Sequence, residues 1–429
     1  MPLADRPDRR LVIVVRADPV ICGHSGEARN LAEAALTRGF DDVRIVTWPI
    51  ETLRAASLPL KPLDHVLPYS DGITVERPAG VGDYKVPDGR HLAGLTGRLV
   101  ELFTDGVPTV CLSLYLTPHD TVVAAARQTA FATGLPTDLT TIAEAVGSDI
   151  TNVVRSCVDR SQFGSAAQLF SNYLANDRCV AVSEYTRDLI VDAATEIDRR
   201  HGTTFAARCR ERVDISYPAI DASAFTSITP ATVDAVVARR GLAPDGYVLF
   251  LSRLAKAKGV DDLIAGFARS RARHHVKLVI AGNGPEAVAL RAMAATSPAA
   301  DQIVFLDDVD DAEKPALMAG CAAFALPSKA RPEFVVTFGI AVVEKLLSGG
   351  GPVITCRTGG FTEACGDHAL YVPPGSPQSI AEAIDRAIGS MSPAELAARA
   401  TEARRWAKQF DRTSVFDKLF APLGNAAAA

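Results

Sequence analysis

Short apolar runs rich in β-branched residues alternate with amphipathic segments along the whole chain. Runs that fit buried strands are 11–15, 43–48, 107–115, 139–146 and 179–183, and then 247–252, 276–282, 302–307, 321–328 and 351–356. Helical patterns fall between them, for example at 29–39, 185–197, 260–270 and 338–348. Such alternation is typical of parallel sheets covered by helices on both faces. Two series of it predict an α/β protein with two Rossmann-like, doubly wound domains that face a cleft.

A segment of prolines and small polar residues at 217–230 interrupts this pattern and indicates a domain boundary. We expect an N-terminal domain over residues 1–220 and a C-terminal domain over 221–407. The C-terminal helix, about 408–429, is expected to pack back on the N-terminal domain. The Pro- and Gly-rich segment 59–94 is predicted to be a long irregular excursion.

Composition narrows the class of protein. The 429 residues carry a net charge of -5, so no basic excess points to nucleic acid or an anionic membrane. No apolar run approaches the roughly 18 residues of a membrane span, and the eight cysteines show no metal-binding spacing. We therefore expect a cytoplasmic protein with buried, reduced thiols and without a bound metal or cofactor. A homodimer is compatible with the sequence.

The strongest local signal follows the first strand of the second series. Ser252 and Arg253 end that strand, and Lys258 stands five positions after Arg253, across a turn into a helix. Two fixed cations at such a turn can neutralise a diphosphate and stabilise it as it departs. The alternative is that both are ordinary surface cations. A second turn contains Gly282 and Asn283 and suits a close approach of ligand or backbone. It lacks the third glycine of a dinucleotide fingerprint.

A third signal is the segment 331–355. Thr337, Phe338, Gly339 and Ile340 would open a helix, whose first amides and positive dipole end bind phosphate or sugar hydroxyls well. Glu344, on the next turn, could accept hydrogen bonds from a ribose diol. Its alternative is a solvated helix residue, although the apolar residues before it indicate a mostly buried helix.

The first half contributes further candidates. Gly23 and Gly26 precede a helical pattern and would let a substrate, the donor in our interpretation, approach the backbone. His119, Glu144 and Asp149 are candidate acceptor-binding residues. They fall at the C-terminal ends of predicted strands, where doubly wound sheets bind ligands. Alternatives are a loop histidine for His119 and a helix N-cap for Asp149.

Together these segments resemble the retaining GT-B glycosyltransferases of family four. The matching segments, in the family's order, are 23–36, 146–149, 179–188, 217–225, 249–267, 278–286, 325–328, 337–355 and 358–365. The resemblance implies that Arg253 and Lys258 hold the donor diphosphate, that Glu344 holds the ribose, and that amides near Gly339 and Ile340 hold the phosphate. Val309 would flank the base. Within this family the chain most resembles glycosyltransferases of actinobacterial antibiotic pathways, which act on aminocyclitols or on the thiol of ergothioneine.

Two positions depart from the family's pattern. The family has a second glutamate eight positions before the ribose ligand, where it touches the donor sugar, and this chain has Val336 there. Glu333 lies three residues earlier and is a candidate substitute. The family's histidine before Gly-Ser-Asp is also missing, because Ala145 and Val146 occupy that place and Glu144 lies one step earlier.

The sequence thus predicts a metal-independent, retaining transferase that moves a sugar from a UDP- or GDP-linked donor to a small-molecule acceptor. Two other functions stay open. A GT-B glycoside phosphorylase would need no ribose ligand, and a catalytically impaired sugar-nucleotide-binding partner protein would explain Val336. An NAD-dependent oxidoreductase is disfavoured by the incomplete glycine pattern.

Overall fold

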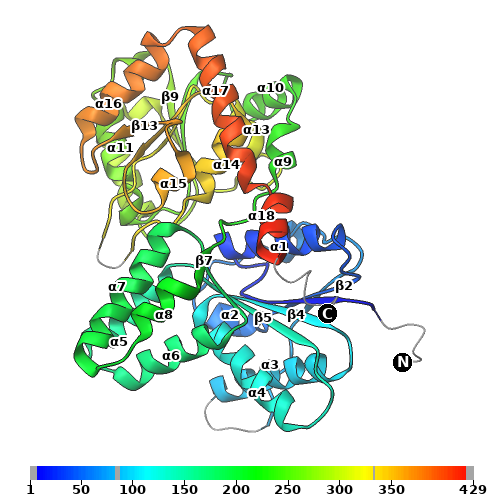
Figure 1. The fold of residues 1–429 in the computed structure, drawn as a ribbon. Helices are drawn as coiled ribbons and strands as arrows, with labels where there is room; N and C mark the ends of the chain where they lie inside the picture. Colours follow the sequence, from blue (N-terminus) through cyan, green and yellow to red (C-terminus); the bar gives the residue numbers. More distant parts are fainter. Residues whose placement is uncertain (1–6, 83–86, 332–333, 422–429) are drawn as a thin grey trace. The chain divides into compact units, whose positions relative to one another are not determined.

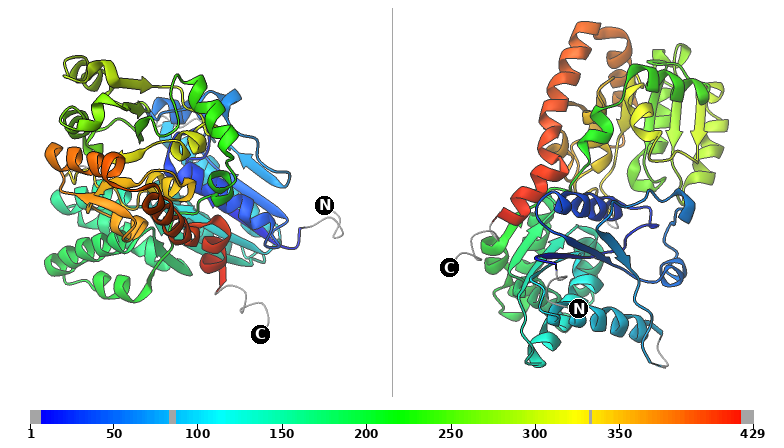
Figure 2. Two further views of the ribbon diagram at one scale, coloured as in Figure 1. Left: turned by 90° about the horizontal axis from the view of Figure 1, so that it is seen from above. Right: turned by 90° about the vertical axis from the view of Figure 1, so that its right-hand side faces the viewer.

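The computed structural model describes residues 7–82, 87–331 and 334–421. The chain divides into two compact units, each built on its own sheet. One unit holds the described residues up to Ala219 together with a C-terminal helix, and the other is Ile220–Asp411. Helices cover both faces of each sheet (Figures 1 and 2).

The strands and helices of the N-terminal unit alternate as the pattern predicts. They are β1 (Arg10–Val14), α1 (Gly23–Leu36), β2 (Asp42–Val46), α2 (Ile50–Ala55), β3 (Ile73–Glu76), α3 (Pro87–Thr104), β4 (Thr109–Leu114), α4 (Thr121–Ala132), β5 (Leu139–Ala145), α5 (Arg155–Asp159), α6 (Phe163–Ala175), β6 (Arg178–Ala181), α7 (Glu184–His201), α8 (Phe205–Arg212), β7 (Val213–Ile215) and α18 (Arg412–Phe420).

The C-terminal unit repeats the alternation with shorter elements. They are α9 (Ala222–Thr226), α10 (Pro230–Arg239), β8 (Tyr247–Leu251), α11 (Val260–Phe267), β9 (Lys277–Ala281), α12 (Ala287–Ala295), β10 (Ile303–Leu306), α13 (Lys314–Ala319), β11 (Ala323–Leu326), α14 (Ile340–Ser348), β12 (Val353–Cys356), α15 (Phe361–Cys365), β13 (Ala369–Val372), α16 (Pro377–Asp385) and α17 (Pro393–Ala407).

Both sheets are parallel, and each has one point where the strand order reverses. The first sheet runs β3-β2-β1-β4-β5-β6-β7, and the second runs β10-β9-β8-β11-β12-β13. The reversal therefore lies between β1 and β4 in one unit and between β8 and β11 in the other. Loops that leave neighbouring strands there diverge, which opens the crevice where doubly wound sheets bind ligands.

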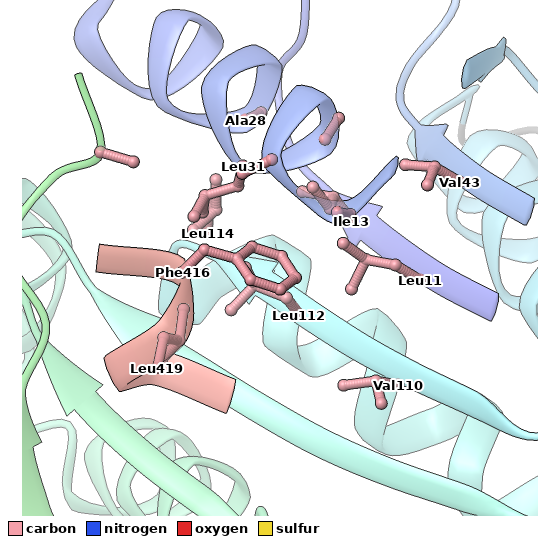
Figure 3. Close-up of a cluster of buried hydrophobic side chains, with 14 of the residues drawn as sticks. Leu11, Ile13, Ala28, Leu31, Val43, Val110, Leu112, Leu114, Phe416 and Leu419 are labelled. Atoms are coloured by element: carbon pink, nitrogen blue, oxygen red, sulfur yellow. The ribbon is translucent and has the colours of Figure 1, made fainter. Parts of the chain in front are cut away.

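Helix α18 belongs to the core of the N-terminal unit. Phe416 and Leu419 are buried against Leu31 of α1 and Leu112 of β4 (Figure 3). An ion pair between Arg38 and Asp417, 2.6 Å between Nε and Oδ1, joins the same two helices. Because the pair is exposed, the buried apolar side chains supply most of the stabilisation.

The prediction of two Rossmann-like domains is confirmed, but three local expectations were wrong. Segment 59–94 contains β3 and the beginning of α3 and is not irregular throughout. Gly23 and Gly26 lie inside the first turns of α1, which begins earlier than the apolar periodicity suggested. Strands β7 and β13 were missed; each is short and lies at the edge of its sheet. No helix in the described ranges is long and apolar enough to cross a membrane.

Candidate active site

The C-terminal unit places two cations at its switch point. Arg253 follows β8 and is exposed, and Lys258 is partly exposed just before α11. Neither forms an ion pair with a carboxylate in the part of the chain that the structure describes. Burial, reinforced by the charge of Arg253, lowers the pKa of Lys258 to about 8. Two cations that the described residues leave without a counter-ion, at a ligand-binding edge, favour an anionic ligand.

Backbone contacts fix the loop that carries Arg253. The Leu254 amide donates to the Asn283 carbonyl at 2.9 Å, and the Leu254 carbonyl accepts from the Glu286 amide at 3.1 Å. Gly282 has φ of 130°, and a Cβ there would overlap the carbonyl oxygen of Ser252. The predicted tight turn at Gly282 and Asn283 therefore supports the cationic loop through the backbone.

The loop after β11 supports Lys258 from the other side of the switch point. The Lys329 amide donates to the Ala257 carbonyl at 2.8 Å. The ammonium of Lys258 lies 5.2 Å from the ring centroid of Phe334, within the range of a cation–π contact. The loops that follow β8 and β11 thus lie against each other, as the strand order predicts.

The segment before α14 adds a helix N-terminus to this site. Thr337 is partly exposed, Phe338 is buried against Phe410 with ring centroids 5.1 Å apart, and Gly339 directly precedes Ile340, the first residue of α14. The first amides of α14 have no partner within their own helix, which makes this end suited to phosphate.

Val336 lies in the same segment, and its side chain is only 7% exposed. Its carbonyl accepts from the Gly360 amide at 3.0 Å, so its backbone is fixed against the loop before α15. Glu333, the candidate substitute for the missing carboxylate, lies outside the described residues.

Glu344 is buried in the second turn of α14 and pairs with a residue that the sequence pattern did not single out. Nζ of Lys314 lies 2.7 Å from Oε1 of Glu344. Lys314 is the first residue of α13, so the pair joins the starts of two neighbouring helices. No pattern in the sequence predicted this pairing because the residues are thirty positions apart.

The loop after β10, expected to flank the base, is held by arginines. Asp307 accepts from Arg291 and Asp308 from Arg240, at 2.6 and 2.9 Å. The Asn283 amide group donates to the Asp307 carbonyl at 2.7 Å, and Val309 is partly exposed between these anchors. In the described residues, no group of three or more His, Cys, Asp or Glu side chains is arranged to hold a metal ion.

In the N-terminal unit the candidate acceptor residues also gather at the switch point. The carboxylate of Asp149 is fully buried and accepts hydrogen bonds from the amides of Leu116, Val146, Gly147 and Ile150, at 2.9–3.2 Å. In this arrangement Asp149 fixes the backbone of two strand-end loops, and it has no exposed face for a ligand.

Glu144 faces a carboxylate that the sequence pattern did not reveal. Glu144 is fully buried at the end of β5, and Glu27 of α1 is only 2% exposed. Among the described residues, neither carboxyl group has a hydrogen-bond partner of good geometry. Burial raises the pKa of Glu27 to about 7, and burial together with the charge of Glu27 raises the pKa of Glu144. A shared proton relieves the repulsion of such a pair.

His24 lies close enough to Glu27 for their charges to interact, and Tyr115 and His119 adjoin it in turn. The rings of His24 and His119 lie 6.2 and 5.5 Å, centroid to centroid, from the ring of Tyr115. Tyr115 has φ of 131°, a strained conformation that is concentrated at ligand-binding edges. His119 is buried against Trp48, and burial and the charge of Arg16 hold its pKa well below its ordinary value. Its ring is therefore neutral.

The first turns of α1 follow β1 at this edge of the sheet and are partly exposed. Gly23 and Gly26 are exposed, and a Cβ built on Gly26 would meet no atom within 4 Å. The signal that could have revealed Glu27 is its place on the buried stripe of α1, with Leu31 and Ala35. A carboxylate on such a stripe is costly unless it is functional or protonated.

Residues 240–405 match the family described as Glycosyl transferases group 1. The matched residues make up most of the C-terminal unit, so that unit is similar to group 1 glycosyl transferases. All the donor-site candidates of the C-terminal unit lie within the matched residues.

Two curated relatives extend the match. The chain is 30% identical over 223 residues to a GDP-mannose-dependent alpha-(1-6)-phosphatidylinositol monomannoside mannosyltransferase of Mycolicibacterium smegmatis, covering 50% of this chain and 57% of the relative. It is 26% identical over 220 residues to a 2-deoxystreptamine glucosyltransferase of Streptomyces kanamyceticus, covering 49% and 54%. The chain thus spans a little over half the length of these relatives.

The likeness of fold covers the whole chain. The structure of Anabaena HepE in complex with UDP-glucose superposes with a TM-score of 0.67, covering 97% of this chain and 99% of that one, at 19% identity. At this identity the likeness establishes the GT-B fold and nothing finer.

Proposed function

We propose that this protein is a retaining glycosyltransferase that moves a sugar from a nucleotide diphosphate donor to a small-molecule acceptor. The observation that carries the proposal is the pair of cations Arg253 and Lys258, for which the described residues provide no counter-ion. They lie near a helix N-terminus at the switch point of the unit that matches group 1 glycosyl transferases. A diphosphate supplies the negative charge that this arrangement lacks.

In the proposed reaction, the bond between the anomeric carbon and the diphosphate oxygen breaks, and the electron pair leaves with the diphosphate. The acceptor nucleophile forms its bond to the anomeric carbon on the same face. Its proton passes to the departing diphosphate oxygen, so atoms and charges balance. Arg253, Lys258 and the first amides of α14 stabilise the charge of the leaving group as it develops. Fixed cations take the place that a metal ion has in other transferases, so we propose that turnover needs no added metal.

The remaining donor contacts follow from the resemblance. Glu344 would accept hydrogen bonds from the ribose, and Val309 would flank the base. At the position of Val336 the donor sugar would meet an apolar side chain. The donor is therefore a sugar that lacks a hydroxyl there, carries a bulkier substituent or is held from elsewhere, for instance by Glu333.

The acceptor would bind at the switch point of the N-terminal unit, near His119, Glu144 and the exposed turn at Gly23 and Gly26. We propose a small molecule of secondary metabolism as the acceptor, in a pathway of antibiotic type. Support comes from the relative in Streptomyces kanamyceticus, whose name specifies 2-deoxystreptamine.

A thermal-shift panel of UDP, GDP and their sugars tests the donor class without knowledge of the acceptor. A ligand at 100 times its Kd stabilises the folded state by about 2.7 kcal/mol, which raises the unfolding temperature measurably. We expect a shift with one nucleotide family and none with inorganic phosphate alone. Absence of any nucleotide effect, with stabilisation by phosphate, would favour a glycoside phosphorylase. Binding without transfer to any acceptor would favour an impaired partner protein.

Variants then test the site itself. Arg253→Ala and Lys258→Ala each remove a charge-assisted contact worth about 1.5–3 kcal/mol, which corresponds to roughly tenfold to a hundredfold in turnover. Lys256→Ala is the matched control because this exposed lysine lies in the same turn. Turnover at the wild-type level in both test variants would assign Arg253 and Lys258 to the surface.

A further inference from the structure

Lys314 and Glu344 form a largely enclosed ion pair at the candidate donor site. Nζ of Lys314 lies 2.7 Å from Oε1 of Glu344, and the two side chains are 21% and 11% exposed. Among the described residues no second group hydrogen-bonds the Glu344 side chain, so Oε2 has no partner within this part of the chain. One oxygen of the carboxylate is therefore fixed, and the other is available.

The residues around Lys314 explain why its ammonium pairs with Glu344. The next residues of α13, Pro315, Ala316 and Leu317, are buried, and the ring centroid of Phe225 lies 5.4 Å from Nζ. An ammonium in such surroundings needs a counter-charge. The carboxylate of Glu344 provides it and raises the pKa of Lys314, against the effect of burial. The ammonium of Lys314 is therefore charged at neutral pH.

Hydrogen bonds at the start of α13 fix the backbone from which Lys314 reaches Glu344. Lys314 begins α13, and its own amide donates to the Asp310 carbonyl at 3.1 Å. Asp310 in turn accepts the amides of Ala312 and Glu313 at 2.9 and 2.8 Å. The backbone that carries the ammonium is thus fixed, and it can orient the carboxylate on the neighbouring helix.

We propose that Lys314 is a positioning residue that orients Glu344, so that the free carboxylate oxygen selects a ribonucleotide through the ribose hydroxyls. This inference rests on the proposed function, because it requires that a nucleotide bind at this site. A hydroxyl donates to an ionised carboxylate more strongly than to a neutral acceptor. A carboxylate that rotates freely would lose much of this preference, because it would pay the cost of being ordered when the nucleotide binds.

The test compares ribonucleotides with their 2′-deoxy counterparts. Dissociation constants for UDP, dUDP, GDP and dGDP are measured by titration calorimetry on the full-length protein. We expect the wild type to prefer the ribonucleotide of one base, and Lys314→Met to reduce that preference about tenfold. Lys314→Arg, which keeps the charge, should restore most of it. Because each preference is a ratio of two dissociation constants, a general loss of stability affects both constants and leaves the ratio unchanged.

Two further variants separate orientation from simple support of helix α14. Arg404→Met is the matched control, because Arg404 donates to the carbonyls of Leu347 and Ser348 at the other end of α14, at 2.9 and 3.0 Å. It should leave the ratio at its wild-type value. In a Glu344→Gln background, Lys314→Met should reduce the ratio no further, because the two residues act as one unit.

The outcomes distinguish the inference from the function on which it rests. A wild type that binds neither UDP nor GDP would overturn the proposed donor class. A wild type that prefers ribonucleotides while Lys314→Met keeps the full preference would overturn the role of Lys314 alone. If Lys314→Met does not fold, Lys314→Gln is measured in its place and the same ratio decides.

Discussion

The chain turns so tightly at Gly259 that a side-chain Cβ at this position would overlap the carbonyl oxygen of Pro327. Gly259 separates Lys258 from helix α11, and Pro327 follows strand β11. The contact joins the two loops that diverge at the switch point of the C-terminal sheet. The position of the Lys258 ammonium therefore depends on the absence of a side chain one residue later.

Gly259→Ala should displace this turn and weaken the donor site. Gly259 has φ of 69°, and Gly241 is a matched control, because its φ of 65° carries the same backbone cost and a Cβ there would meet no atom within 4 Å. We expect Gly259→Ala to destabilise the fold by about 1–3 kcal/mol more than Gly241→Ala and to raise the KM for the donor. Calorimetric unfolding and donor kinetics measure the two effects. Equal effects of both substitutions would show that the contact with Pro327 yields easily.

The low pKa of Lys258 predicts a pH dependence of donor capture. Because burial and Arg253 lower it to about 8, the free protein loses this cation as pH rises through about 8. The kcat/KM for the donor should fall above that pH, since this ratio reports groups of the free enzyme. At saturating donor the fall should begin at higher pH, because a bound diphosphate favours the charged form. Lys258→Arg should remove the alkaline fall, and an unchanged profile in that variant would contradict the assignment.

The sequence could predict the parts of this site that depend on local patterns, but not the contacts between residues distant in the chain. Arg253, Lys258 and the start of α14 lie beside strands and turns whose pattern is local, so their place at one sheet edge could be inferred. Lys314 could not be found this way, because its partner lies on another helix and only packing brings the two together. Glu27 was missed because the beginning of α1 looks like a glycine-rich loop, and a loop has no buried face.

The same distinction applies to the fold: strands with a clear pattern of their own were predicted, and a strand that depends on its partner was not. Long apolar runs such as 109–114 identified central strands, since strands buried on both faces read as continuous apolar sequence. The edge strand β3 lies in a polar segment, and its burial pattern is only partial. Its identity depends on pairing with β2 and could not be inferred from its own residues.

The carboxyl pair Glu27 and Glu144 predicts that stability depends on pH near neutrality. The pKa of Glu27 is raised from its ordinary value to about 7 in the folded state. The protonated Glu27 carboxyl therefore contributes to the free energy of unfolding. This contribution is fully present below the ordinary pKa and is lost as pH rises through about 7, because the carboxyl group ionises more readily in the unfolded state. Glu144→Gln removes one charge of the pair and should flatten the fall in unfolding temperature as pH rises through this range. The exposed Glu51→Gln is the control. An equally steep fall in Glu144→Gln would mean that the two carboxyl groups do not interact.

Val336 offers the sharpest test of donor identity. In the resembling family a carboxylate at this place accepts hydrogen bonds from the donor sugar, and a buried hydroxyl left without a partner costs about 1–3 kcal/mol. We predict that Val336→Glu improves turnover with plain hexose donors and worsens it with the native donor. Since Val336 is 7% exposed, the new carboxylate would be partly desolvated and should lower the unfolding temperature until a hexose donor binds.

Val336→Gln tests whether the charge or the shape matters, and Val335→Glu, at the partly exposed neighbouring position, controls for a nearby charge. If Val336→Glu lowers turnover with every donor, the valine is a packing residue, and its identity carries no information about the sugar. If the wild type binds nucleotide sugars without transferring them while Val336→Glu transfers well, the natural protein is impaired in catalysis, because one restored carboxylate would then supply what its donor site lacks.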